Sequence, residues 1–160
     1  MSTKHWQLSS YAVFLVCLTL ADINAANVQA SLGSAVNRPN SNAVEFITVE
    51  ELKSKITKKE RVTIIDVRSS ANYAGSDVKI KGAIRVKPTR LKGRLSVAPL
   101  KDVPRNSEVI TYCGSPNDKS GVQAAEVLLA SGFTRVRVLK GGWQEWLKVG
   151  GQVEARPKAP

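Results

Sequence analysis

The chain has few of the side chains that most enzymes use for catalysis. Its 160 residues include one histidine, His5, and two cysteines, Cys17 and Cys113. His5 and Cys17 fall in an N-terminal segment that is typical of a cleaved signal, so the mature chain would keep one cysteine and no histidine. This excludes an intramolecular disulfide, a Cys/His zinc site, a Ser/His/Asp triad and a Cys/His dyad. No Gly-rich phosphate-binding fingerprint follows a strand either, so we expect no metal and no cofactor.

Residues 1–26 have the layout of a secretory signal peptide. Lys4 precedes an apolar run from Tyr11 to Ala21, and small residues follow it. The run is shorter than the roughly 20 residues of a membrane span. We therefore predict a signal peptide over residues 1–26, a flexible linker over residues 27–44, and a periplasmic or secreted protein. The alternative is an uncleaved N-terminal anchor, which would be the chain's only attachment to a membrane.

Positive charge exceeds negative charge along the whole chain. Lysine and arginine number 24 against 13 acidic residues, a formal net charge of +11 at pH 7. A basic field raises the local concentration of anions. An exported protein meets little nucleic acid, so we expect no nucleic-acid partner and favour small oxyanions or an acidic protein partner. The alternative is that the lysines only solvate the surface.

Hydrophobic patterning between residues 45 and 155 predicts alternating strands and helices. Runs rich in β-branched residues predict strands at 62–67, 83–86, 108–112 and 136–139. Capping and periodicity predict helices from Thr48 to about Lys58, at 70–74, at 120–131 and at 143–149. We therefore expect an α/β domain with a central, mainly parallel sheet flanked by helices. Asp66 and Cys113 stand at strand ends, where the sites of such sheets form.

Cys113 is followed by an irregular polar loop, Gly114 to Lys119, that leads into a predicted helix. Free N–H groups of such a loop, and the positive end of the helix dipole, favour a thiolate without a histidine base. They can also hold the outer sulfur of a persulfide or the oxygens of an anion. Lys119 is a candidate partner for an anionic substrate, and Asp118 or Ser120 is a candidate helix cap. The alternative is that Cys113 is an inert core thiol.

From Ile47 to about Val153 the sequence resembles a rhodanese domain. The segments that carry the resemblance are Thr48-Val49-Glu50-Glu51-Leu52, Ile65-Asp66-Val67-Arg68, Ile80-Lys81-Gly82-Ala83-Ile84, Val109-Ile110-Thr111-Tyr112-Cys113, Gly132-Phe133-Thr134-Arg135-Val136 and Leu139-Lys140-Gly141-Gly142-Trp143 with Trp146. The resemblance implies a rhodanese-like α/β fold over residues 45–155. It also implies a sulfurtransferase that moves sulfane sulfur from an anionic donor, such as thiosulfate, to a thiophilic acceptor, such as cyanide or a thiol.

The same resemblance assigns roles to individual residues. It implies that Cys113 is the catalytic sulfur carrier and that Asp66 and Arg68 are structural supports for the loop. The substrate-binding cradle that it implies consists of Gly114, Ser115, Pro116, Asn117, Asp118, Lys119 and Ser120.

The loop departs from the common family pattern. It is one residue longer and resembles the Cys-x-x-Pro-Asn-acidic loop of a minority of bacterial rhodanese domains. The longer loop is also typical of Cdc25-type phosphatases and arsenate reductases, but Lys119 lacks the planar fork with which arginine holds a tetrahedral anion. A further alternative is a non-catalytic module that carries sulfur or binds a partner. Trp143 and Trp146 would then serve recognition, although their spacing is more typical of core packing.

Overall fold

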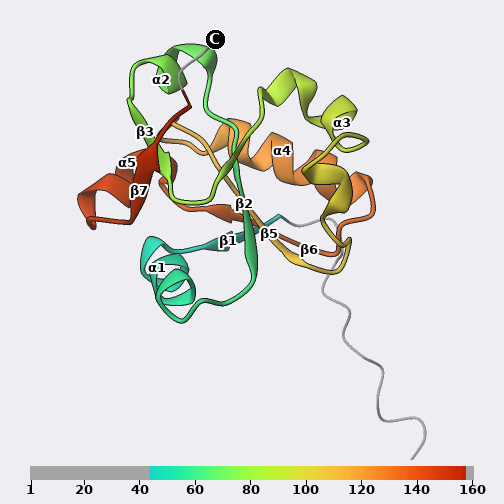
Figure 1. The fold of residues 1–160 in the computed structure, drawn as a ribbon, viewed down its shortest axis with the longest axis horizontal. Helices are drawn as coiled ribbons and strands as arrows, with labels where there is room; N and C mark the ends of the chain where they lie inside the picture. Colours follow the sequence, from blue (N-terminus) through green and yellow to red (C-terminus); the bar gives the residue numbers. More distant parts are fainter. Residues whose placement is uncertain (1–43, 158–160) are drawn as a thin grey trace, which may run out of the picture. The chain divides into compact units, whose positions relative to one another are not determined.

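The computed structural model describes residues 44–157, so the predicted signal peptide and residues 27–43 of the predicted linker lie outside the described residues. A five-stranded sheet forms the middle layer, in the order β1-β6-β5-β2-β4, and every neighbouring pair is parallel (Figure 1). Its strands are β1 (Glu45–Ile47), β2 (Val62–Asp66), β4 (Ile84–Arg85), β5 (Glu108–Tyr112) and β6 (Arg135–Leu139). This confirms the predicted α/β class and its mainly parallel sheet.

Helices cover both faces of the sheet. The structure has α1 (Val49–Thr57), α2 (Ser70–Ala74), α3 (Leu91–Arg94), α4 (Lys119–Ala130) and α5 (Gly142–Lys148), with short 3-10 turns η2 (Pro88–Arg90) and η3 (Leu100–Asp102). Side chains of α3 and α4 pack in one core cluster, and those of α1 and α5 pack in another on the opposite face. Neighbouring strand residues alternate between the clusters, as Ile65 and Ile64 do.

The long strands and helices agree with the sequence-based predictions to within one or two residues. The side chain of Thr48 accepts a hydrogen bond from the backbone N–H of Glu51, so the predicted cap opens α1. None of the helices within the described residues has the length and apolar character needed to cross a membrane.

Three short strands were not predicted. β1 pairs with β6 at one edge of the main sheet, and β3 (Val78–Ile80) forms a separate antiparallel pair with β7 (Val153–Ala155). No helix or strand was predicted between residues 86 and 105. This region contains η2, α3 and η3, and it buries Leu91, Leu95 and Leu100 against the α4 face of the sheet. Its prolines explain why these elements are short.

Candidate active site

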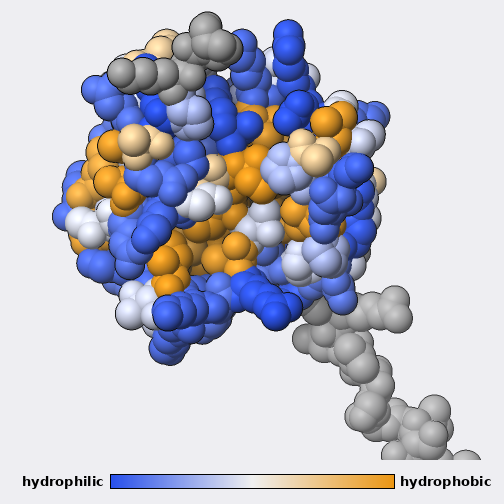
Figure 2. Space-filling view, viewed as in Figure 1, coloured by the Kyte–Doolittle hydropathy of each residue, from blue (hydrophilic) through white to orange (hydrophobic). Residues whose placement is uncertain are grey.

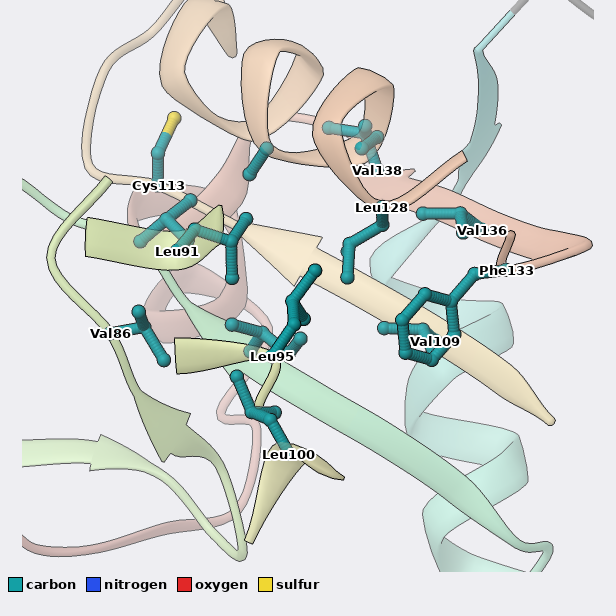
Figure 3. Close-up of a cluster of buried hydrophobic side chains, with 14 residues drawn as sticks. Val86, Leu91, Leu95, Leu100, Val109, Cys113, Leu128, Phe133, Val136 and Val138 are labelled. Carbon is teal, nitrogen blue, oxygen red and sulfur yellow. The ribbon is translucent and has the colours of Figure 1, made fainter. Parts of the chain in front are cut away.

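Cys113 lies immediately after β5, at the carboxyl edge of the sheet. Cys113 is only 1% exposed and is a member of the core cluster that packs beneath α4. Figure 3 shows the sulfur at the upper end of this cluster, directed away from the apolar side chains that pack below it. The thiol Sγ lies 3.7 Å from the carbonyl oxygen of Ser115 in the following loop. The thiol therefore belongs to the boundary between core and loop.

The loop after Cys113 and the first turn of α4 contain several backbone N–H groups that have no hydrogen-bond acceptor within the described part of the chain. They belong to Gly114, Ser115, Asn117, Ser120 and Gly121. The last two come from the first turn of α4, where a helix always leaves N–H groups unpaired. Such groups, together with the helix dipole, make a site for a negatively charged sulfur or oxygen.

Two glycines allow this loop to pack closely. A Cβ at Gly121 would lie 3.0 Å from Val138 Cγ1, so the missing side chain lets the start of α4 pack closely on β6, and the same position is 3.9 Å from Cys113 Sγ. A Cβ at Gly114 would lie 2.8 Å from Asn72 Nδ2. Helix α2 therefore packs directly against the loop. The importance of Gly121 and Asn72 was missed from the sequence, because neither stands in a motif.

Asp118 connects the loop to the turn between β6 and α5. Its residue is 6% exposed, and its Oδ2 accepts a hydrogen bond of 2.8 Å from the N–H of Gly141. Its Oδ1 is buried with no partner within the described residues. Burial raises the pKa of the Asp118 carboxyl, and the hydrogen bond from Gly141 and the charge of Lys140 oppose this effect. One oxygen of the Asp118 carboxylate is thus bound to Gly141, and the other has no hydrogen-bond partner among the described residues.

The predicted cap of α4 is wrong in its chemistry. Asp118 occupies the capping position, but its backbone is left-handed, with φ of 53°, and neither its side chain nor that of Ser120 caps the helix. Asn117 Oδ1 instead accepts a hydrogen bond of 3.4 Å from the N–H of Lys119, and it also accepts one from the hydroxyl of Ser115. The Asp118 carboxylate instead accepts a hydrogen bond from the N–H of Gly141. If Asp118 capped α4, this N–H group would lose its acceptor.

The start of α5 lies in close contact with the backbone of Cys113. The N–H of Trp143 donates a hydrogen bond of 2.8 Å to the Cys113 carbonyl oxygen. Gly142 has φ of +51°, and a Cβ there would overlap that carbonyl oxygen. Gly142 is therefore required both for its left-handed backbone and for this close approach. Trp143 and Trp146 are 4% and 0% exposed, so the idea that they form a recognition surface is wrong.

Asp66 and Arg68 form a fully buried ion pair beside Tyr112, the residue that precedes Cys113. The guanidinium Nη2 of Arg68 lies 2.8 Å from Asp66 Oδ2, and its Nε contacts both carboxylate oxygens. A second donor, the Tyr112 hydroxyl, lies 2.8 Å from Asp66 Oδ2. Burial, with the Asp66 charge and hydrogen bond, raises the pKa of Tyr112 far above its usual range, so the phenol stays protonated as a donor.

Arg68 also reaches the elements around the pair. Its Nη2 donates a hydrogen bond of 3.1 Å to the carbonyl oxygen of Val78 at the start of β3. Its guanidinium carbon lies 4.3 Å from the centroid of the Trp143 ring. The pair thus connects β2 and β3 with Tyr112, which precedes Cys113, and with Trp143, whose N–H donates a hydrogen bond to the Cys113 carbonyl oxygen. This geometry supports the structural role that we predicted for Asp66 and Arg68, and the role itself stays a prediction.

The other predicted cradle residues lie in the same loop. Pro116 and Asn117 are exposed, whereas Ser115 and Ser120 are half-buried. Lys119 is exposed and forms no ion pair within the described part of the chain. Among residues 44–157 no group of three or more His, Cys, Asp or Glu side chains is placed to hold a metal ion.

Comparison with known proteins identifies the family. Residues 48–149 match the rhodanese-like domain family, and the chain therefore belongs to it. A search of curated proteins found no match.

Solved structures share this fold. The rhodanese-like domain of the Alr3790 protein from Anabaena sp. is 28% identical, with 74% of this chain and 87% of that chain covered and a TM-score of 0.59. The human single-domain sulfurtransferase TSTD1 is 24% identical, with coverage of 66% and 97% and a TM-score of 0.55. A Rhodopseudomonas palustris protein described as a possible tyrosine phosphatase is 20% identical, with coverage of 69% and 85% and a TM-score of 0.60. Likeness to the last two structures therefore identifies the fold and not the activity.

Proposed function

We propose that the chain is an exported sulfurtransferase of the rhodanese type, in which Cys113 carries sulfur as a persulfide. The observation that carries this proposal is the segment that follows Cys113. Several backbone N–H groups between this cysteine, at the end of β5, and the first turn of α4 have no acceptor within the described residues. Membership of the rhodanese-like family and the likeness to a human sulfurtransferase support it.

In the first step, the Cys113 thiolate attacks the outer sulfur of thiosulfate. A new S–S bond forms between Cys113 and that sulfur, while the S–S bond of thiosulfate breaks and its electron pair leaves with sulfite. The total charge of −3 is conserved, since a thiolate and a dianion become a persulfide anion and sulfite. Negative charge thus remains beside the loop throughout, where fixed N–H donors stabilise it without reorganisation.

In the second step, a thiophilic acceptor attacks the outer sulfur of the persulfide. With cyanide the products are thiocyanate and the Cys113 thiolate, and with a thiolate they are an acceptor persulfide and the Cys113 thiolate. The outer sulfur stands about 2 Å beyond Sγ. Because the Cys113 residue itself is only 1% exposed, this extension makes the transferred atom easier to reach than the thiol. Splitting the transfer into two steps is characteristic of covalent catalysis.

Two other activities remain as outcomes of the test. A non-catalytic sulfur carrier would accept sulfur on Cys113 without turnover. Phosphate or arsenate chemistry would need a cation that grips a tetrahedral anion at two points. Lys119 is a point charge on an exposed side chain and cannot provide that fork.

The first experiment is intact-mass spectrometry of the protein recovered from the periplasm of a bacterial host. Treatment with thiosulfate should add one sulfur, about 32 Da, which cyanide then removes. Cys113→Ser should show no adduct. The same spectrum reports whether residues 1–26 have been cleaved. An adduct with no catalytic turnover would indicate a carrier, and no adduct with any sulfane donor would overturn the proposal.

A further inference from the structure

A strongly basic pocket lies beside the Cys113 loop. It has a volume of about 440 Å³ and lies between α2 and α3, next to β4. Five cationic side chains line it, namely Arg85, Lys87, Arg90, Arg94 and Arg156, and none of its lining residues is acidic. Figure 2 shows strongly hydrophilic side chains gathered in this region, between α2 and α3 in the same view as Figure 1.

Most of these cations have no partner of opposite charge. Within the described part of the chain, Lys87, Arg90, Arg94 and Arg156 form no ion pair. The guanidinium of Arg85 lies 3.7 Å from Asp66, whose carboxylate is already held by a shorter contact from another guanidinium. Burial lowers the pKa of Arg85. Bringing an anion into the pocket would therefore relieve an unfavourable concentration of positive charge.

Two of the arginines are held in place by other contacts. The Nη1 of Arg85 donates hydrogen bonds to three backbone carbonyl oxygens, and its guanidinium carbon lies 4.4 Å from the centroid of the Tyr73 ring. Arg156 packs on the same ring at 5.6 Å, and its Nε is buried without an acceptor in the described structure. A positioned guanidinium loses less conformational entropy on binding than a free surface side chain.

Val86 and helix α2 connect the pocket with the Cys113 site. Val86 lines the pocket and packs in the same core cluster as Cys113. Helix α2 contributes Tyr73 to the pocket, and its Asn72 packs against Gly114 of the loop. A ligand in the pocket would therefore lie next to the loop that holds the transferred sulfur.

The other side of the loop has the opposite character. A pocket of about 420 Å³ there is lined by Pro116 and Asp118 of the loop and contains two further carboxylates, Glu50 and Glu145, with Lys140 as its one cation. Of these carboxylates Glu145 is paired with Lys148, so the contrast rests mainly on the unpaired cations of the basic pocket, and an anion that approaches Cys113 is attracted more strongly to the α2–α3 side. The charges flanking the loop define one direction of approach.

We propose that the basic pocket binds a small organic anion with two or more carboxylate-type groups. Resting on the proposed function, we infer that this anion is the charged part of the thiol that accepts sulfur from Cys113. The pocket volume suits a small organic molecule, and arginine forks suit carboxylates. The acceptor thiolate forms a bond to the outer sulfur, the bond from that sulfur to Cys113 breaks, and its electron pair returns to the Cys113 thiolate.

The test compares two thiols on protein that has been loaded with thiosulfate and then freed of it. The probes are mercaptosuccinate, which has two carboxylates, and uncharged 2-mercaptoethanol. The variant is Arg90→Gln/Arg94→Gln. The matched control is Lys58→Gln/Lys59→Gln, which removes two exposed charges after α1, outside the pocket. The ratio of wild-type to variant rate is taken separately for each thiol, so that differences in thiol reactivity cancel.

We expect the rate of sulfur transfer to mercaptosuccinate to fall about tenfold in the pocket variant, as when charge-assisted hydrogen bonds are removed. The rate with 2-mercaptoethanol should stay unchanged. The control should change both rates by less than about twofold. If the pocket variant loads normally and both thiols respond equally, the inference is wrong while sulfur transfer stands.

A second measurement keeps the inference testable if wild-type protein accepts no sulfur. Succinate, which cannot react with a thiol or persulfide, is titrated into the unloaded protein by calorimetry. Binding that Arg90→Gln/Arg94→Gln abolishes and the lysine control keeps would support the anion site on its own. Absence of binding to the wild-type protein would overturn it.

Discussion

The buried pair of Asp66 and Arg68 offers a quantitative test of how the loop is supported. Both residues are 0% exposed, so removing one partner leaves the other charge in the interior. Such a change typically costs about 3–5 kcal/mol of unfolding free energy. We expect Asp66→Asn to be the worse single change, because Arg85, 3.7 Å from Asp66, would still partly compensate the carboxylate in Arg68→Met. Replacing both should cost much less than the sum, because no charge of the pair is then stranded.

Urea unfolding followed by tryptophan fluorescence measures these costs. The ring of Trp143 lies 4.3 Å from the Arg68 guanidinium, so it reports on this region. With a urea slope of about 2 kcal/mol/M, a loss of about 4 kcal/mol would move the midpoint down by about 2 M. Lys148→Met, which breaks the exposed pair with Glu145, is the control and should cost less than about 1 kcal/mol. Single costs below about 1 kcal/mol, or strictly additive costs, would refute the reasoning.

Two further changes probe the contacts of the loop backbone. Gly142→Ala should cost more than about 1 kcal/mol, the amount expected for a left-handed residue alone, because the new Cβ would overlap the Cys113 carbonyl oxygen. Thermal unfolding measures this cost, and Gly82→Ala is the control, since Gly82 has φ of +76° and open space around it. Equal costs for the two variants would contradict the overlap. Asp118→Asn keeps an acceptor for Gly141 but removes a buried charge. Because the folded pKa of Asp118 is raised, the wild-type protein loses stability as pH rises from the unfolded value of about 4 through the folded value. The stability of the Asn variant relative to wild type should therefore increase between pH 4 and pH 7 in urea unfolding, and an unchanged difference would contradict the burial argument.

The main strands and helices were predictable because each has a strong local pattern. Val62–Asp66 and Glu108–Tyr112 are continuous runs rich in β-branched residues, and the structure makes them the adjacent strands β2 and β5. Their carboxyl ends place Asp66 and Cys113 at one edge of the sheet, as the parallel arrangement requires. The edge on which the site lies was therefore accessible from periodicity alone.

The contacts within the site were less predictable, because they depend on residues far apart in the chain. Asp118 stands where a helix cap is expected, yet its partner is the N–H of Gly141, 23 positions further along. The strands Val78–Ile80 and Val153–Ala155 have three residues each, too few to show a period, and they form only by pairing with one another. Local signals carry no information on such long-range pairs.

The clustering of charged side chains also depends on contacts between residues far apart in the chain. In the sequence the excess of 24 basic over 13 acidic residues is spread along the chain, which is equally compatible with a uniformly solvated surface. Folding brings Arg85, Arg94 and Arg156 together on one side of the Cys113 loop, while carboxylates line the pocket on the other side. A net charge attracts anions from every direction, but a charge difference across a loop selects one direction of approach. If Cys113 carries sulfur as we propose, the arrangement of these side chains, more than their number, would decide which acceptors reach it.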